Sequence, residues 1–182
     1  SDSAGLTRMT LERDLLEILA FIDRPKQLLY SLGTAIGGRG VGIWAADNTQ
    51  MFYPTDVAAD TLVATLLFAL DSIDSASAVR VGIGVHFGEY YDLLGGLYGE
   101  QADAIEEIAE NHTEAGELVI SRAVVDRLPF GHGFTLVPRP DITPIGPLYR
   151  VTDGPRLPLR PAHPGRYPIP YSDEFYSDLQ TY

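Results

Sequence analysis

Apolar positions come in short runs along the chain, separated by glycine, proline and charged residues. The first run, residues 15–23, is too short for its periodicity to separate a buried strand from one side of a helix, so residues 10–22 stay open between the two. We favour a strand, because Pro25 interrupts the run and the residue before a proline avoids helical geometry. A helix is then expected over residues 26–36, where a pair of glycines closes it.

The rest of the chain predicts strands and helices in alternation, with two hairpins among them. The first hairpin turns at Asp47-Asn48, a pair that accepts left-handed turn geometry, and the second turns at Gly88. Hairpins make a purely parallel sheet impossible, so we predict an α+β fold with helices over one mixed, largely antiparallel sheet of about seven strands. The expected elements are strands at 41–46 and 49–53, a helix to about 72, strands at 79–87 and 89–96, a helix at 101–111, a strand at 117–121, a helix at 122–128, and strands from 134 and 147.

The composition changes at residue 153. Residues 1–152 are predicted to form one domain, and residues 153–182 a proline- and tyrosine-rich C-terminal arm or tail. The proline spacing favours polyproline II, and tyrosines give a large contact area at a small cost in entropy. Such an arm would pack on its own domain, on a second subunit or on another protein, and the alternative is a disordered tail.

The net charge of −12 argues against nucleic acid and anionic membranes as main partners, because both require a basic surface. Between Arg39 and Arg122 the only cation is Arg80, against fourteen carboxylates. The chain has no cysteine, which excludes disulfides and thiolate metal sites. No run is apolar and long enough for a membrane span and there is no signal peptide, so a cytoplasmic location is expected.

Several segments occur in an order that carries a family resemblance. They are GIWAADNTQMF, VRVGIGVHFGE, LYGEQADAIEE, EAGELVIS, RAVVDRL and PLYRVT. Together they resemble the class III adenylate/guanylate cyclase homology domain, over a stretch from about Gly37 to Thr152. The resemblance implies the ferredoxin-like core of nucleotidyl cyclases. It also implies a homodimer, because in that family each active site lies between two chains.

The resemblance implies two metal-binding aspartates, since cyclases of this family use two metal ions to activate the ribose oxygen and neutralise the triphosphate. Asp47 lies at the position of the second aspartate, and Asp23 follows an apolar run as the first would. The two are only 24 positions apart, which is shorter than the helical connection that the family pattern leads us to expect. Mg²⁺ or Mn²⁺ would bind here only if the chain is an enzyme.

Other positions of the family pattern carry residues that cannot perform the family's chemistry. Ile43 replaces the base-reading lysine, and Gly96 replaces the second base-reading residue. Asp103 replaces the transition-state asparagine, and Glu107 replaces the phosphate-holding arginine. Losing one donor aimed at developing charge typically lowers a rate by ~10²–10³, and replacing arginine by glutamate turns an attraction into a repulsion.

These substitutions predict a catalytically silent cyclase-like domain, without cofactor, that serves as a dimerisation or regulatory module in signal transduction. Two alternatives stay open: a divergent metal-dependent nucleotidyl cyclase that uses Asp23 and Asp47, and a nucleotide sensor without turnover. A fold does not determine an activity, so the residues have to decide among them.

The helix expected at 101–111 carries a carboxylate ridge, which we define as Asp103, Glu106, Glu107 and Glu110. Such a charge run is usually a solvated face, and the alternative is a docking surface for a basic protein partner.

Three other signals are weaker. Glycines 82, 84 and 88 miss the dinucleotide-binding fingerprint by one residue and lead into a second strand, so close strand packing or a tight turn explains them better. The four histidines show no metal-ligand spacing and are interpreted as ordinary polar or core residues. Ser121 is interpreted as a helix cap.

Overall fold

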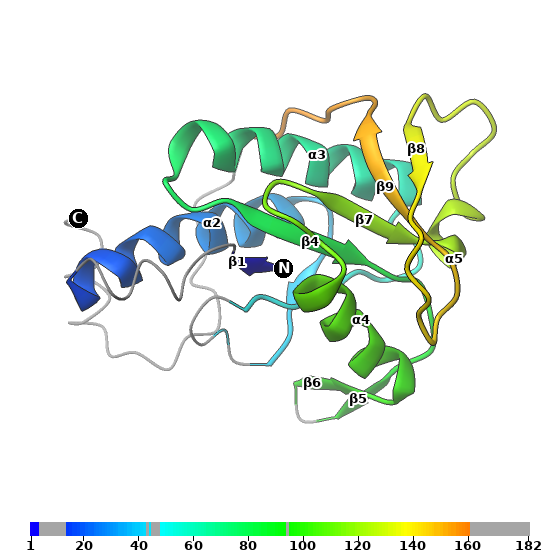
Figure 1. The fold of residues 1–182 in the computed structure, drawn as a ribbon, viewed down its shortest axis with the longest axis horizontal. Coiled ribbons are helices and arrows are strands. Elements are labelled where there is room, and N and C mark those ends of the chain that lie inside the picture. The colour runs from blue at the N-terminus through cyan, green and yellow to red at the C-terminus, as the bar shows by residue number, and fades with distance from the viewer. Residues whose placement is uncertain (4–13, 43, 45–47, 94, 161–182) are drawn as a thin grey trace.

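The computed structural model describes residues 1–3, 14–42, 44, 48–93 and 95–160. Strands and helices alternate along most of the chain (Figure 1). The helices are α2 (Leu15–Ala35), α3 (Ala59–Ala76), α4 (Glu100–Asn111) and α5 (Arg122–Val125). The strands are β1 (Asp2–Ser3), β2 (Arg39–Gly40), β3 (Met51–Phe52), β4 (Val81–Val85), β5 (Tyr91–Leu93), β6 (Gly96–Tyr98), β7 (Leu118–Ser121), β8 (Thr135–Pro138) and β9 (Leu148–Asp153).

The main sheet is mixed, which confirms the predicted α+β class. Its strands follow the order β1-β4-β7-β9-β8. The central pair, β4 and β7, is parallel, and every other neighbouring pair is antiparallel. The described part of this sheet has five strands rather than about seven, because β2–β3 and β5–β6 form separate two-stranded sheets. Strand β8 lies at the edge, ends in Pro138, and has a register shift next to Leu136.

The N-terminal segment is a helix, so the strand predicted for residues 15–23 is wrong. Helix α2 runs from Leu15 through Pro25 to Ala35, and Asp14 caps it by accepting a hydrogen bond from the Leu16 N–H at 2.8 Å. Its buried positions Ile18, Ile22, Leu29 and Leu32 repeat at helical spacing. Tertiary packing of this face therefore outweighs the single backbone hydrogen bond that a proline removes. The predicted end near residue 36 is confirmed.

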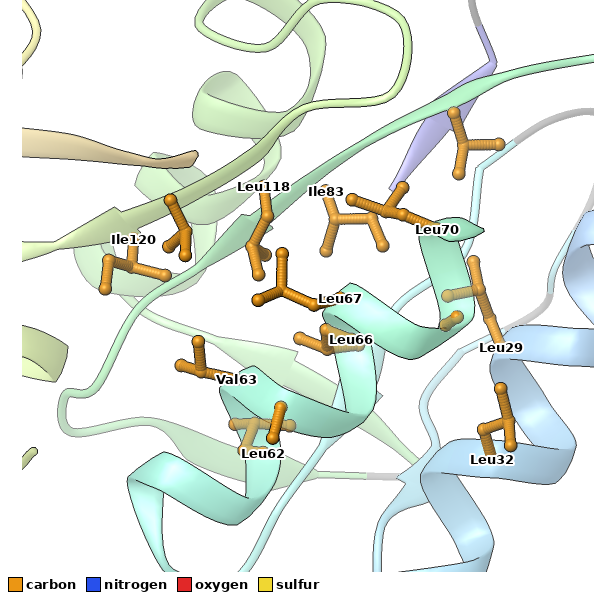
Figure 2. Close-up of a cluster of buried hydrophobic side chains, with 14 of the residues drawn as sticks. Leu29, Leu32, Leu62, Val63, Leu66, Leu67, Leu70, Ile83, Leu118 and Ile120 are labelled. Carbon is orange, nitrogen blue, oxygen red and sulfur yellow. The ribbon is translucent and has the colours of Figure 1, made fainter. Parts of the chain in front are cut away.

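Helices α2 and α3 cover one face of the main sheet (Figure 1). Figure 2 shows the resulting core, in which Leu62, Leu66 and Leu67 of α3 meet Ile83, Leu118 and Ile120 of the central strands. All six of these side chains are almost completely shielded from solvent. This cluster is the largest hydrophobic core of the described chain and fixes the positions of β4 and β7.

Helix α4 covers the opposite face, where glycines of β4 let it approach closely. A Cβ on Gly84 would lie 2.8 Å from Ile108 Cγ2, and a Cβ on Gly82 would overlap Thr113 Oγ1. Ile108 packs against Val119 on this face. Gly82 and Gly84 therefore let strand and helix pack closely, which agrees with the first of the two predicted explanations, close packing or a tight turn, and not with a dinucleotide turn.

The strand pair predicted for residues 79–87 and 89–96 does not form. Strand β4 pairs with β1 and β7, while β5 pairs with β6 in a short antiparallel sheet next to α4 (Figure 1). The turn between β5 and β6 includes Gly95, whose φ of 82° favours glycine. Gly88 has another role, because the place of its missing Cβ is occupied by Gln101 Oε1.

The predicted C-terminal arm begins along α3. The Leu157 N–H donates to the Ala64 carbonyl at 3.2 Å, and the Arg156 Nε donates to Asp71 at 3.0 Å. Leu157 and Leu159 pack against the core cluster. The first residues of the arm thus lie on their own domain, and residues 161–182 fall outside the described residues. None of the described helices is long and apolar enough to cross a membrane.

Candidate functional site

An open cleft of about 1080 Å³ lies between the end of β4, the start of α3 and the length of α4. Apolar residues from four elements contribute to its walls: Leu29 of α2, Phe52 of β3, Leu66 of α3 and Ile105 of α4. The aromatic residues along it are Trp44, Phe52, Tyr53, Phe87, Tyr90 and Tyr91. A cleft this large and this apolar is at the upper end of the size range of ligand pockets.

Helix α4 places one side of the carboxylate ridge on the cleft. All four ridge residues are exposed, while Ala102, Ala104 and Ile108 are buried against the sheet. Glu106 and Glu110 line the cleft, one helical turn apart, and Asp103 and Glu107 do not. The rotation of α4 about its axis thus divides the ridge into a cleft side and an outer side. Glu107 Oε1 lies 3.8 Å from His112 Nε2 on the outer side.

A polar cluster around His86 joins β4 to α4 and β7. The His86 Nδ1 lies 2.9 Å from the Ser121 Oγ, and the His86 Nε2 lies 3.2 Å from the Gln101 Oε1. Gln101 Oε1 also accepts from the Glu89 N–H at 3.0 Å. Because that oxygen acts as an acceptor, neutral His86 donates from Nε2 and accepts at Nδ1 from the Ser121 hydroxyl. Ser121 precedes α5 as predicted, but its hydroxyl bonds to His86 and makes no capping bond.

Burial sets the protonation of this cluster. It lowers the pKa of His86, against the weaker opposing effect of the hydrogen bond with Gln101. Burial also raises the pKa of Tyr90 to about 12, and it raises the pKa of Tyr53 above its ordinary value. The Tyr90 hydroxyl donates to the His86 carbonyl at 3.4 Å. The side chains of His86, Tyr90 and Tyr53 are therefore neutral at physiological pH.

The charged groups that line the cleft are mostly carboxylates. Four glutamates line it, against a single arginine or lysine side chain, Arg127, among the described residues. The guanidinium carbon of Arg127 lies 3.8 Å from the ring centre of Phe87, which holds this cation by a cation–π contact. The four glutamates are Glu89, Glu100, Glu106 and Glu110.

Most other described arginines form ion pairs with carboxylates outside the cleft. Within the described residues, none of the four cleft glutamates has an ion pair or a side-chain hydrogen bond, so their charges are uncompensated. The arginine pairs are Arg39–Asp92, Arg80–Asp74, Arg122–Asp126, Arg139–Glu117, Arg150–Glu117 and Arg156–Asp71.

A second polar network anchors the C-terminal end of α4 to the sheet. Glu117, which is buried, accepts from Arg139 at 2.7 Å and from Arg150 at 2.9 Å. Arg139 also donates to Asp141 at 2.8 Å, and Asp141 lies 2.9 Å from the Nδ1 of His112. The hydrogen bonds from Arg139 and His112 lower the pKa of Asp141 to about 2. Burial alone would raise the pKa of Glu117, but its bonds to Arg150 and the Glu114 N–H and the charge of Arg139 lower it overall.

The structure describes only some of the site residues predicted from sequence. Asp23 lies inside α2 with 6% of its surface exposed, rather than at the end of a strand. Ile43 and Asp47 lie outside the described residues, so their positions relative to Asp23 are not described. Gly96 lies in β6 opposite Leu93 and offers no side chain to read a base. Within the described ranges, no group of three or more histidine and acidic side chains could hold a metal ion.

The polar cluster around His86 and the aromatic side chains that line the cleft were not predicted from the sequence. His86, Gln101 and Ser121 are 15 and 35 residues apart, and no spacing rule connects them. The stacking of Arg127 on Phe87 likewise joins distant segments. Only GVHFGEYY, a run with five polar or aromatic residues after a buried strand, could have indicated a functional loop.

Comparison with known proteins identifies the fold. No protein-family model matches the chain, and no curated protein sequence matches it significantly. Among solved structures, the catalytic core of a rhodopsin-guanylyl cyclase with converted specificity, in complex with ATPαS, superposes with a TM-score of 0.68 at 16% identity, over 84% of this chain and 92% of that one. The adenylyl cyclase CyaB from P. aeruginosa gives a TM-score of 0.68 at 14% identity, over 85% and 92%.

A third similar structure is the non-canonical dimeric guanylyl cyclase domain of the RhoGC fusion protein from the fungus Blastocladiella emersonii, with a TM-score of 0.62 at 13% identity, over 84% of this chain and 93% of that one. The same fungal domain has also been crystallised as a monomer. The chain thus has the fold of class III adenylate/guanylate cyclase domains, which the sequence motifs predicted.

Proposed function

We propose that this domain is a catalytically silent relative of the nucleotidyl cyclases that acts as a dimerisation and regulatory module in signal transduction. The observation that carries the proposal is the charge of the cleft. Four uncompensated glutamates line it, and its one described arginine is stacked on Phe87. We expect no catalytic cofactor, and Mg²⁺ or Mn²⁺ would be needed only by the alternative enzyme.

Electrostatics oppose a nucleoside triphosphate in this cleft. At a separation of 4 Å, each phosphate–carboxylate pair is unfavourable by ~1–4 kcal/mol for effective dielectric constants of about 80 to 20. Asp103 and Glu107, at the family's asparagine and arginine positions, lie on the exposed outer side of α4. A second chain that met this side would receive carboxylates where a cyclase supplies a transition-state donor and a phosphate ligand. Both the cleft and the outer side therefore disfavour binding and cyclisation of a polyanion.

The first prediction concerns turnover. Incubation of the purified protein with ATP or GTP and Mn²⁺ should give no cyclic nucleotide above the protein-free blank, because the donors for the transition state are absent. The readout is chromatography of the products, with equilibrium dialysis of labelled nucleotide in parallel. An active adenylyl cyclase assayed in the same buffer is the positive control.

Each other outcome of this assay supports a different function. Cyclic product that disappears when Asp47 is changed to Asn would show a divergent metal-dependent cyclase and overturn the proposal. Saturable binding of nucleotide without product would show a sensor. Replacing Glu107 by Gln should leave the absence of product unchanged, since the neutral amide restores only part of the missing charge pattern.

Support for dimerisation comes from the β5–β6 sheet. Tyr91, Leu93 and Tyr98 are 71%, 58% and 53% exposed, although they are large and apolar. Three such side chains on one short sheet next to α4 form an apolar patch of the kind that marks protein interfaces. A fungal guanylyl cyclase domain of the same fold has been crystallised as a non-canonical dimer and as a monomer.

Self-association is the second prediction. Sedimentation velocity should show a dimer at micromolar concentrations, because burial of this apolar patch drives association. The double variant Leu93→Asp/Tyr98→Asp should shift the dimer–monomer equilibrium by at least about tenfold toward monomer, since a buried unpaired carboxylate is strongly unfavourable. The matched control is Glu100→Asp, which changes an exposed residue near the patch without changing its charge. A monomer at all concentrations would contradict the dimer.

A further inference from the structure

We infer that the cleft is a docking groove for a basic, apolar peptide segment of a partner protein. The inference rests on the proposed function, because a groove that served a nucleotide would need the opposite charge. On the cleft side of the carboxylate ridge, Glu106 and Glu110 would contact the partner. On the outer side, Asp103 and Glu107 would stay exposed to solvent.

Charge complementarity gives the first part of the partner's chemistry. Glu89, Glu100, Glu106 and Glu110 border the groove and have no cation to pair with among the described residues. Arg127, the one described arginine or lysine of the lining, is held against Phe87. Lysine or arginine side chains of a partner would therefore meet exposed carboxylates next to apolar walls, and covering those walls on binding would strengthen the ion pairs relative to pairs on an open surface.

The apolar walls of the groove indicate the second part of the partner's chemistry. Phe52, Tyr90 and Ile105 line the groove together with Leu66 and Val85, so aliphatic side chains of a partner would be buried between the cationic ones. Lysine and arginine also bury their own methylene stems along such surfaces while their charged ends reach the glutamates. A metal ion or a small polyamine would leave these apolar walls unfilled.

A peptide segment fits this combination of groups. The groove presents carboxylates for cations and apolar walls for aliphatic groups, and a single basic apolar peptide provides both partners together.

The test measures binding of a short fluorescein-labelled peptide of alternating lysine and leucine to the protein of residues 1–182 by fluorescence anisotropy. The variant Glu106→Gln/Glu110→Gln should weaken binding by about fivefold to tenfold. The matched control Asp103→Asn/Glu107→Gln removes two charges from the same helix on its outer side and should weaken binding less than about twofold. Equal losses in both variants would show nonspecific attraction to an acidic protein and overturn the proposal.

A second peptide tests whether the apolar walls contribute to binding. A peptide with serine in place of leucine should bind at least about fivefold more weakly to the wild-type protein, since the apolar walls then lose their partners. Circular dichroism and thermal unfolding establish that each variant is folded. Unchanged affinity for the serine peptide would overturn the apolar part of the proposal.

Two other occupants of the groove have distinct signatures. If the C-terminal arm of the same chain fills it, Arg160→Ala/Arg166→Ala will tighten peptide binding; if a second copy fills it, Glu106→Gln/Glu110→Gln will change the self-association constant. Either result overturns the external partner. Cyclic product in the nucleotide assay would instead refute the proposed function and is measured without any peptide, so the two failures are distinguishable.

Discussion

Replacing Leu118 with alanine should lower the free energy of unfolding by about 2–5 kcal/mol and the Tm by roughly 4–20 °C. Leu118 is completely buried in β7, and Figure 2 shows it facing α3 beside Ile83 and Leu67. Alanine would remove its apolar contacts and leave a cavity between the sheet and α3, because neighbouring strands constrain how far the backbone relaxes. Urea unfolding followed by circular dichroism measures the change.

The same substitution at Leu93 is the control, because this leucine is 58% exposed on β5. Leu93→Ala should change the free energy of unfolding of the monomer by less than about 0.5 kcal/mol. A loss at Leu93 equal to that at Leu118 would mean that the α3 side of the sheet is not the main core, and would contradict the packing described above.

Removing the Glu117 carboxylate should destabilise the protein at neutral pH and much less in acid. Glu117→Gln should cost about 1–3 kcal/mol at pH 7, because a buried acceptor of two arginine hydrogen bonds loses its charge, and the exposure of Arg150 limits the loss. The pKa of Glu117 is lowered in the folded protein and that of Asp141 is about 2. Unfolded carboxyl groups titrate near pH 4, so their stabilisation is complete above about pH 5 and is lost as the pH falls toward 2.

The measurement is urea unfolding of wild type and variant at pH 7 and pH 3. The difference in free energy between the two proteins should shrink at pH 3, because the unfolded wild-type chain then takes up protons on carboxyl groups that stay ionised in the folded protein. Glu106→Gln, which removes an exposed carboxylate without a described partner, should change stability by less than about 0.5 kcal/mol at both pH values. A difference that grows in acid would contradict the assigned direction of the Glu117 pKa.

Much of the fold follows from local sequence signals, and the failures have a physical cause. The strands at Leu118 and Leu148 and the helix starting at Glu100 were predicted within a few residues, because apolar runs and turn residues bound them clearly. The segment before Pro25 was wrongly predicted as a strand. Proline is unfavourable inside a helix, but burial of one face of α2 against distant parts of the chain stabilises the helix more than the proline destabilises it. The β5–β6 sheet was missed because its turn lies at Gly95 and not at Gly88.

Only the site residues that lie together on one helix could be predicted from the sequence. The sequence placed Asp103, Glu106, Glu107 and Glu110 on one helix, and the structure agrees. Which of them face the cleft depends on how Gly82 and Gly84 seat α4 against β4, a contact between segments that no periodicity reports. The pairing of His86 with Ser121 is a tertiary contact of the same kind.

The outer edge of the main sheet protects the protein from aggregation. Strand β8 is the last strand on that side, its pairing with β9 has a register shift next to Leu136, and it ends in Pro138, followed by Pro140. Proline offers no N–H to an incoming strand and an irregular edge pairs poorly, so neighbouring molecules are poorly templated for fibril growth along β8. Copies of this protein at a high local concentration can therefore meet often without polymerising through this edge.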